Sequence, residues 1–353
     1  MEWGQKMNFY QVRKMKNLNI IFLPIVLLAI IFTYAAQAAP EDSGFFNELF
    51  RSETHAMKGK GPSTRISYDY TQFPARAVQN KGTDIRVRRQ NISAYEAVSE
   101  SENSKFAIAP SLSADEYDTT SHIPVTNESV PSTLWNPSVT AVYSHTYDKD
   151  SLSTAFTISS PSNRPYANWD VLGLNSHLVY RTPSGDKNQW LLMAQWSNTR
   201  NYLNWIPLPG VAYLWNQSDS FKAVIGIPFL GIWVSPFDKF SISAFFSVLS
   251  FAHVRAEYAI NMMTKIYTQY RVDTKSYMLF DRDNIKDRLF NEETTLSGGI
   301  IFPVKKMASL DLGGGYAFKR RMFIDSRYSK KDHTRELDFD PAGYGQLKLS
   351  MAF

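Results

Sequence analysis

The chain has 353 residues, of which 14% are aromatic and 20% charged, and it contains no cysteine. The lack of cysteine excludes a disulfide-stapled fold and a cysteine-based zinc site, and the balance of apolar and charged residues excludes a disordered chain. A mean hydropathy of −0.30 excludes a bundle of transmembrane helices, each of which needs a run of about 20 apolar residues.

Residues 1–38 have the layout of a secretory signal peptide. Basic residues between Arg13 and Lys16 precede an uncharged apolar stretch that runs from Leu18 to Ala36, and Ala36-Gln37-Ala38 is a small-x-small motif. We therefore expect cleavage between Ala38 and Ala39. Residues 1–14 are expected to be an upstream extension if translation starts at Met15. The alternative is an uncleaved N-terminal anchor helix.

Removal of residues 1–38 changes the charge of the chain. The segment holds four basic residues and one acidic residue, so the net charge falls from +5 to +2. This small remaining charge argues against a nucleic-acid partner. Residues 39–62 are expected to form a periplasmic tail or a short helix capped by Ser43, and residues 63–353 the main domain.

The main domain shows apolar residues at alternate positions. From Phe240 to Val248 every second residue is apolar, and serines occupy three of the intervening positions. Similar runs cover His253–Asn261 and Ala308–Phe318, and most runs are 9–15 residues long. Soluble strands average about 5–6 residues, whereas strands that cross a bilayer need about 9–11.

Alternating strands of this length predict an all-β fold, a closed antiparallel transmembrane β-barrel. Closure is required because lipid offers no partner for an unpaired backbone group. We expect the apolar rows to face lipid and the polar rows to face the lumen. About fourteen strands are predicted, and 12 to 16 remain open because prolines and the 239–261 segment allow two divisions. The predicted strands lie near 64–73, 84–98, 104–113, 137–147, 151–160, 168–182, 188–199, 209–216, 220–235, 239–261, 265–280, 290–303, 307–324 and 342–353.

The connections between these strands alternate in length. Short turns are predicted at 147–150, 183–186, 216–219, 261–264 and 303–306. Longer links are predicted at 161–168, 200–207, 281–288 and 325–341. This alternation is typical of periplasmic turns and external loops in outer-membrane barrels.

The C-terminus carries the most specific local pattern. Leu347, Leu349, Met351 and Phe353 alternate with polar or small residues, and the chain stops at Phe353. This pattern resembles the closing strand of Gram-negative outer-membrane barrels. The resemblance implies that these four residues form the signal that the barrel-assembly machinery reads.

A wider resemblance covers about residues 130–353. The stretches at 184–191, 197–213 and 226–229, together with Gly313-Gly314-Gly315-Tyr316-Ala317-Phe318, resemble an uncharacterised Gram-negative outer-membrane β-barrel domain family. The resemblance implies the barrel and a location in the bacterial outer membrane. It implies no activity.

Charged residues on the polar faces are the candidate functional residues. A charge that faced lipid at the bilayer midplane would cost about 2–4 kcal/mol, so we expect these side chains to face the lumen and set its polarity. They either pair with one another and hold a narrow barrel shut, or they line a polar channel. The candidates are Arg86, Arg88, Arg255, Glu257, Arg271 and Asp311.

These features favour a passive channel for small polar solutes. The alternative is a closed structural or receptor barrel that binds an external partner through its loops, and a membrane-embedded lipid hydrolase is less favoured. No catalytic, cofactor-binding or metal-ligating residues are predicted. The expected partners are outer-membrane lipid, lipopolysaccharide and the barrel-assembly machinery, and the sequence leaves the oligomeric state open.

Overall fold

The computed structural model describes residues 64–124, 128–200, 203–247, 251–261, 264–305, 307–326, 328 and 336–353. The predicted signal peptide, its cleavage site at Ala38 and Ala39, and the tail at 39–62 lie outside these residues. Within the described ranges, the structure has no helix of the length and apolarity needed to cross a membrane.

The described chain is built almost entirely of β-strands, with one 3-10 helix, η1 (Trp169–Val171). The strands are β1 (Thr64–Val78), β2 (Thr83–Glu100), β3 (Ser104–Thr119), β4 (Thr133–Tyr147), β5 (Asp150–Ser159), β6 (Gly173–Ser184), β7 (Asn188–Ser197), β8 (Leu208–Ser218), β9 (Phe221–Ile227), β10 (Phe229–Phe237), β11 (Phe240–Ser247), β12 (Phe251–Ala259), β13 (Lys265–Tyr277), β14 (Arg288–Lys305), β15 (Ala308–Asp325), β16 (Glu336–Phe339) and β17 (Ala342–Ala352).

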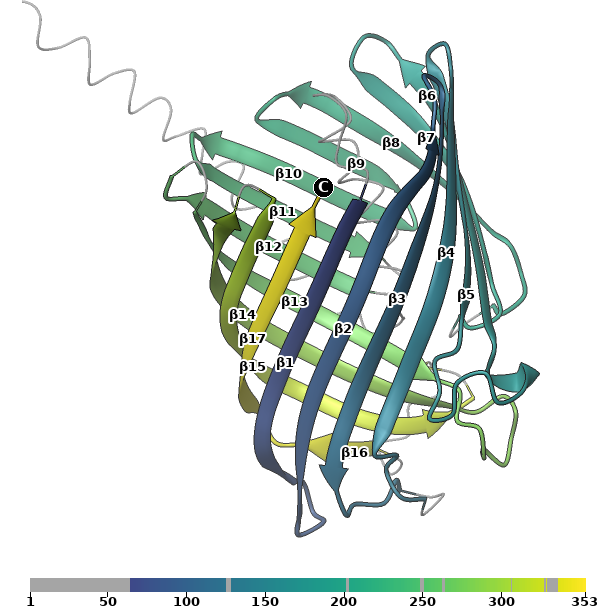
Figure 1. Ribbon diagram of the computed structural model, residues 1–353, viewed down its shortest axis with the longest axis vertical. Coiled ribbons are helices and arrows are strands. Elements are labelled where there is room, and N and C mark those ends of the chain that lie inside the picture. The colour runs from purple at the N-terminus through teal and green to yellow at the C-terminus, as the bar shows by residue number, and fades with distance from the viewer. Residues whose placement is uncertain are drawn as a thin grey trace, which may run out of the picture.

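The strands form one closed barrel (Figure 1). Each strand pairs antiparallel with its neighbours in the chain, and β1 closes the circle by pairing with β17 from Arg65↔Ala352 to Gln72↔Gly345. Asp340 and Pro341 separate β16 from β17, and both of these strands pair with β15 and with β1. They therefore act as one interrupted strand, and the described barrel has 16 strand positions.

The count of 16 corrects the expected fourteen and leaves the predicted fold class intact. The predicted 220–235 strand is a hairpin, because Pro228 has no N–H to donate and the chain reverses there between β9 and β10. The predicted 239–261 strand is likewise two strands, β11 and β12, which pair from Phe240↔Tyr258 to Ser247↔Phe251. Alternation continues through both members of each pair, so periodicity alone did not separate them.

The two ends of the barrel differ largely as the sequence predicted. The exceptions are at the long-loop end, where residues 79–82 and Pro228 are short connections and where β16 lies within the predicted 325–341 link. Short turns join β2 to β3, β4 to β5, β6 to β7, β8 to β9 and β10 to β11, at the end where β1 begins and β17 finishes (Figure 1). The opposite end carries the long links at 120–132, 160–172, 198–207 and 278–287. By the usual arrangement of such barrels, the short-turn end is periplasmic and the long-loop end external.

The outer face of the barrel changes character along the strands. Near the short turns it is apolar, and Ile92 on β2 is 50% exposed there. Toward the long loops the pattern inverts, because Ile85 and Val87 are buried inside the barrel while Arg86 and Arg88 lie on its outer face. The 18 residues of β2 are more than a bilayer crossing needs, so the far part of the strand stands in water.

This inversion corrects the expected position of Arg86 and Arg88. The rule that charges face the lumen holds only where the outer face meets lipid. Beyond the bilayer edge water solvates these guanidinium groups, and Arg88 Nε lies 3.7 Å from a carboxylate oxygen of Glu116 on the same outer face.

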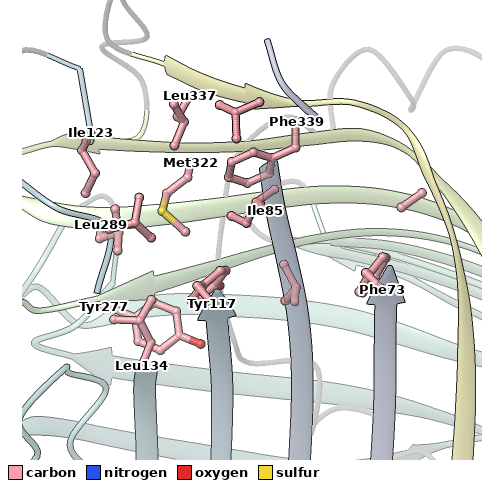
Figure 2. Packing of buried hydrophobic residues seen from close by; sticks show 14 of the residues in the cluster. Phe73, Ile85, Tyr117, Ile123, Leu134, Tyr277, Leu289, Met322, Leu337 and Phe339 are labelled. Atoms are coloured by element: carbon pink, nitrogen blue, oxygen red, sulfur yellow. The ribbon is translucent and has the colours of Figure 1, made fainter. Parts of the chain in front are cut away.

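The inward-facing apolar residues of the long-loop half pack into a core inside the barrel (Figure 2). We call this set the lumen core. Its members come from one continuous arc of the wall, which runs from β13 through β17 and β1 to β4, and from the links at the long-loop end of this arc. Its members are Phe73, Val78, Ile85, Val87, Tyr117, Ile123, Val130, Leu134, Tyr277, Leu279, Leu289, Ala317, Met322, Leu337, Phe339 and Ala342.

The lumen core should contribute to stability as the core of a soluble domain does. Leu289 on β14 is 0% exposed, and we expect Leu289→Ala to lower the free energy of unfolding by about 2–5 kcal/mol through lost contacts and a cavity. The matched control is Leu296→Ala on the same strand, where the side chain faces outward and is 52% exposed. Urea unfolding in lipid vesicles measures both. An equal loss in the two variants would contradict a packed lumen core.

Candidate functional site

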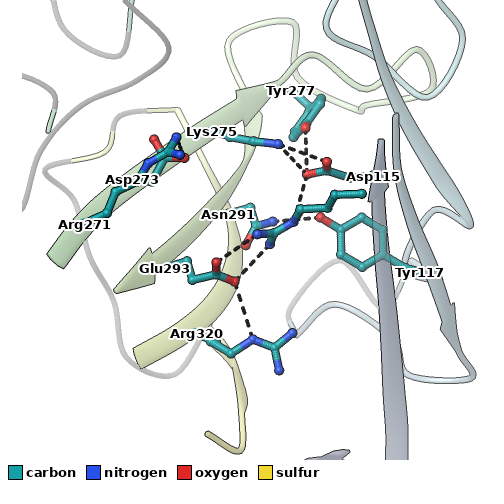
Figure 3. A network of polar contacts seen from close by, with 10 residues as sticks. Asp115, Tyr117, Arg271, Asp273, Lys275, Tyr277, Asn291, Glu293 and Arg320 are labelled. Carbon is teal, nitrogen blue, oxygen red and sulfur yellow. Dashed lines mark hydrogen bonds and ion pairs between the residues drawn. The ribbon is translucent and has the colours of Figure 1, made fainter. Parts of the chain in front are cut away.

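Five charged side chains meet across the lumen (Figure 3). Arg89 on β2 makes a two-pronged contact with Glu293 on β14, with Nη1–Oε1 and Nη2–Oε2 distances of 2.8 and 3.0 Å. Lys275 Nζ on β13 lies 2.9 and 3.0 Å from the two carboxylate oxygens of Asp115 on β3. Arg320 Nε on β15 lies 3.6 Å from Glu293. We call these five residues the lumen network.

The two ion pairs of the network are joined to each other. Arg89 Nε lies 3.6 Å from Asp115, so this guanidinium group bridges both carboxylates. The strands that hold Asp115 and Lys275 are not neighbours in the sheet, and neither are those that hold Arg89 and Glu293. The lumen network therefore ties β2 and β3 to β13 and β14 through the interior of the barrel.

Neutral side chains fix the position of the charged groups. Tyr277 donates a hydrogen bond of 3.1 Å to Asp115, and the Asn291 amide donates one of 2.7 Å to the Tyr117 hydroxyl. The guanidinium groups of Arg89 and Arg320 lie 5.1 and 4.4 Å from the centre of the Phe73 ring. Tyr117, Tyr277 and Phe73 also belong to the lumen core, so the polar and apolar parts are continuous.

The electrostatics of the network are unusual for an open pore. Three cations surround two carboxylates, and Asp115 is only 1% exposed. Removing charged groups from water carries a large cost that only close pairing offsets. The network is therefore a closed contact between two parts of the wall, and its two carboxylates hold three positive charges together.

The long loops also meet above the lumen. The Met278 N–H donates a hydrogen bond of 2.7 Å to the Pro161 carbonyl, and the Phe280 N–H donates one of 2.9 Å to Asn163 Oδ1. The Arg282 guanidinium group donates a hydrogen bond of 2.7 Å to the carbonyl of Asp170. These contacts join the β5–β6 link to the β13–β14 link, whose strands are eight positions apart, so they bridge the external mouth.

The bridged mouth carries an acidic group of residues. Burial, together with the carboxylates of Asp281, Asp283 and Asp287, raises the pKa of Glu128 above its ordinary value. Within the part of the chain that the structure describes, no three His, Asp or Glu side chains are arranged to hold a metal ion.

Four of the charged residues predicted from the sequence do face the lumen. Arg255 and Glu257 form an ion pair of 2.6 Å, and Arg271 contacts Asp273 at 2.7 Å. Asp311 accepts a hydrogen bond of 2.9 Å from Tyr267, whose ring lies 3.9 Å from the Arg255 guanidinium group.

Arg255, Glu257 and Asp311 lie in the short-turn half, apart from the lumen network. Arg271 lies farther along β13, and its partner Asp273 is in register with Glu293 of the lumen network. Glu257 also contacts Lys265 Nζ at 3.5 Å, which extends the same row of charges.

The sequence reasoning missed all five residues of the lumen network. The useful signal was the shared face of Ile85, Val87 and Arg89, which differ by two positions. Arg86 and Arg88 were predicted instead because the face of β2 that carries Ile85 and Val87 was expected to meet lipid. Glu293, which makes the two-pronged contact with Arg89, lies 204 residues away in the chain, and no local pattern relates the two.

The C-terminal residues occupy the closing position of the barrel. The Phe353 N–H donates a hydrogen bond of 2.9 Å to the Thr64 carbonyl. Leu347, Leu349 and Met351 on β17 pair in register with Tyr70, Tyr68 and Ile66 on β1. The last strand is therefore paired on both sides, with β1 and with β15.

No protein-family model and no curated protein matches the chain. Among solved structures, it is similar to the Pseudomonas putida toluene transporter TodX, with a TM-score of 0.40, 9% identity, and coverage of 85% of this chain and 92% of that chain. It is also similar to the beta domain of the Bordetella autotransporter Brka (TM-score 0.33, 10% identity, 83% and 100% covered) and to the KdgM porin (TM-score 0.27, 9% identity, 81% and 99% covered). The resemblance to an uncharacterised outer-membrane family stays a prediction.

The architecture itself confirms the predicted class of protein. A closed antiparallel barrel with an apolar outer face pairs its backbone internally, as a hydrocarbon environment requires. The same architecture characterises proteins of the bacterial outer membrane, which is the location that the sequence predicted.

Removal of one carboxylate from the lumen network should destabilise the barrel. Glu293→Gln leaves Arg89 and Arg320 buried without their shared anion, and we expect a loss of about 3–5 kcal/mol in the free energy of unfolding. Urea unfolding in vesicles measures this change.

Two further variants make the test specific. Glu257→Gln is the matched control, because Glu257 pairs only along one wall and is more exposed to the lumen; it should lose much less. The triple variant Arg89→Met, Glu293→Met and Arg320→Met removes the anion together with both cations that share it. It should recover most of the stability, since apolar side chains of similar volume can replace buried ion pairs. If Glu293→Gln unfolds like the wild type, the network does not stabilise the closed barrel.

Proposed function

We propose that the protein is an outer-membrane channel whose external half is held closed by the lumen network and the lumen core. The observation that carries this proposal is the set of ion pairs that joins β2 and β3 to β13 and β14 through the lumen. A barrel with 16 strand positions has room for a passage, and this one is filled only by its own wall side chains and loops among the described residues.

An ion-pair contact suits a closure that must reopen. A buried ion pair adds little net stability compared with an apolar contact of the same size, because its members regain hydration when they separate. Separation of the two parts of the wall would expose the three cations and two carboxylates to water in the lumen. The ion pairs therefore add little to the free-energy cost of opening.

The lining of the lumen supports a polar path on one side. Arg255, Glu257 and Asp311 line the short-turn half on β12 and β15, and Arg271 on β13 continues this lining toward the lumen network. These charged side chains favour the passage of small polar solutes along that wall, and they keep water in the short-turn half of the lumen, which we call the polar vestibule.

The external loops support a second candidate, a receptor barrel that binds a partner outside the cell. Trp169 in the β5–β6 link is 84% exposed, and Ile285 in the β13–β14 link is also exposed. Large apolar side chains on external loops are a feature of binding surfaces. The bridged mouth places both residues on joined loops.

Conductance across a planar bilayer tests the channel. We expect the purified wild-type barrel to be mostly closed. The double variant Asp115→Asn with Glu293→Gln should raise the open fraction by about two orders of magnitude for a loss of ~3 kcal/mol in the closed state. Glu257→Gln is the control and should leave the open fraction near that of the wild type.

Heat-modifiable migration on gels must first show that each variant is folded. If the folded double variant conducts no more than the wild type at any voltage, the lumen network does not hold the channel closed. Binding of an external protein that is lost on Trp169→Ser, with no conductance in any variant, would favour the receptor barrel instead.

We also propose that the C-terminal residues act as the assembly signal. Deletion of Phe353 removes its backbone contacts with Thr64 and its terminal aromatic ring, so we expect a smaller folded fraction in the outer membrane. Phe353→Tyr keeps the ring and should assemble normally. Heat-modifiable migration of membrane fractions measures the folded fraction, and normal assembly of the deletion variant would refute this role.

A further inference from the structure

The strands on one side of the barrel are short, so the wall there is low along the membrane normal. β9 has 7 residues and β11 has 8, whereas β14 and β15 on the other side have 18 each. A 7-residue strand tilted by about 45° rises only about 16 Å, which is less than the ≈25 Å apolar belt of an outer-membrane barrel. The hairpin at Ile227 and Pro228 therefore ends within the hydrocarbon layer.

The neighbouring strand continues beyond this hairpin. Pairing of β8 with β9 begins at Val211↔Ile227, while β8 stays paired with β7 through Gln195↔Leu208. The edge of β8 from Leu208 to Gly210 thus lies beyond the end of β9. Pro209 suits this edge because it has no N–H that would need a partner.

A pocket of about 250 Å³ opens at this edge. The inward-facing side chains Val179, Met193 and Phe229 form one part of its lining. The outward-facing side chains Leu178 and Ile227 form another part, and Ile227 is 72% exposed. The pocket is therefore open to the lipid side, and the buried apolar side chains of the lumen side lie directly behind it.

The lumen behind the pocket is apolar, which corrects the expectation that polar rows face inward throughout. Inward-facing residues of β6 to β11 pack into a buried apolar cluster, partly covered by Trp233. Its members are Val179, Leu191, Met193, Ala212, Leu214, Val224, Phe229 and Phe245. On these strands, apolar side chains occupy both faces of the wall.

We infer that this pocket is a binding and entry site for a small, uncharged, apolar molecule that arrives from the outer leaflet of the membrane. The inference extends the proposed channel by adding a lateral route and a class of ligand. It depends on the proposed function only for what happens after the ligand has reached the lumen.

The dimensions and lining of the pocket fit this class of ligand. An engineered apolar cavity of ~150 Å³ binds benzene, so about 250 Å³ holds a single ring with substituents or a short aliphatic chain. His177 and Gln195 supply the polar atoms of the lining, and no ionised side chain is among its residues. A charged ligand would lose its hydration there without an opposite charge to pair with.

The arrival route follows from the position of the pocket. Ile225, Ile227 and Val211 are exposed apolar residues on the outer face beside it. The pocket is therefore continuous with the lipid-facing surface. On the external side, the lumen core and the bridged loops occupy the mouth of the barrel.

Photolabelling with an uncharged phenyl-diazirine in lipid vesicles tests the inference on the full-length barrel. The probe is benzene-sized and reacts with what it touches when illuminated. We expect label on the inward-facing residues Val179, Met193 and Phe229, which lipid itself does not contact. Label on the outward-facing Leu312 serves as the internal reference for probe dissolved in the bilayer.

Filling the pocket from the lipid side should block entry. Ala194 lies in the pocket lining on the outer face, so Ala194→Trp places a ring there without overpacking the interior. We expect label on the three inward-facing residues to fall by about tenfold or more relative to Leu312, because each ~1.4 kcal/mol of lost binding is a factor of ten. Ala141→Trp, on the outer face of β4 far from the pocket, is the matched control and should change nothing.

Two results would overturn the inference. The first is absence of label on the inward-facing residues of the folded wild-type barrel while Leu312 is labelled. The second is unchanged inward label in Ala194→Trp, which would mean that the probe enters elsewhere. Neither result depends on ion conductance. A folded Asp115→Asn, Glu293→Gln variant that conducts no more than the wild type would therefore refute the proposed closure and leave this site untouched.

Discussion

The structure depends on a change of solvent along the outside of each strand. Over the middle of the barrel the outer face meets hydrocarbon, and beyond the bilayer edge it meets water. An 18-residue strand such as β2 crosses that boundary, so its apolar side chains lie outside at Ile92 and inside at Ile85. The same alternation of residues thus serves opposite faces in the two halves of one strand.

The closed external half follows from this inversion. Once water covers the outer face, the apolar side chains of the long strands turn inward and must bury each other, as in a soluble domain. The space they fill is the lumen, and the result is the lumen core between β1 to β4 and β13 to β17. The lumen network lies against this core, where Tyr117 and Tyr277 contribute to both.

Strand length makes the barrel asymmetric. The long wall that includes β14 and β15 extends past the bilayer and carries the core, the network and one of the bridging loops. The low wall at β9 and β10 ends within the bilayer, and its inner face is apolar as well. A polar vestibule at Arg255 and Asp311 and an apolar pocket at Met193 and Phe229 therefore lie on different sides of one lumen. This division gives the barrel two chemically distinct linings.

The sequence by itself determined the closed antiparallel barrel, the alternation of short turns with long loops and the inward position of Arg255, Glu257, Arg271 and Asp311. Each of these follows from local periodicity and from the need to pair every backbone group in lipid. Periodicity could not divide 220–235 at Pro228, because the two strands of a hairpin continue the same alternation.

Only the tertiary structure decided which face of a strand meets which solvent and which charges meet across the lumen. Arg89 finds Glu293 more than 200 positions away, since strands distant in the chain come together only when the barrel closes and its external half collapses.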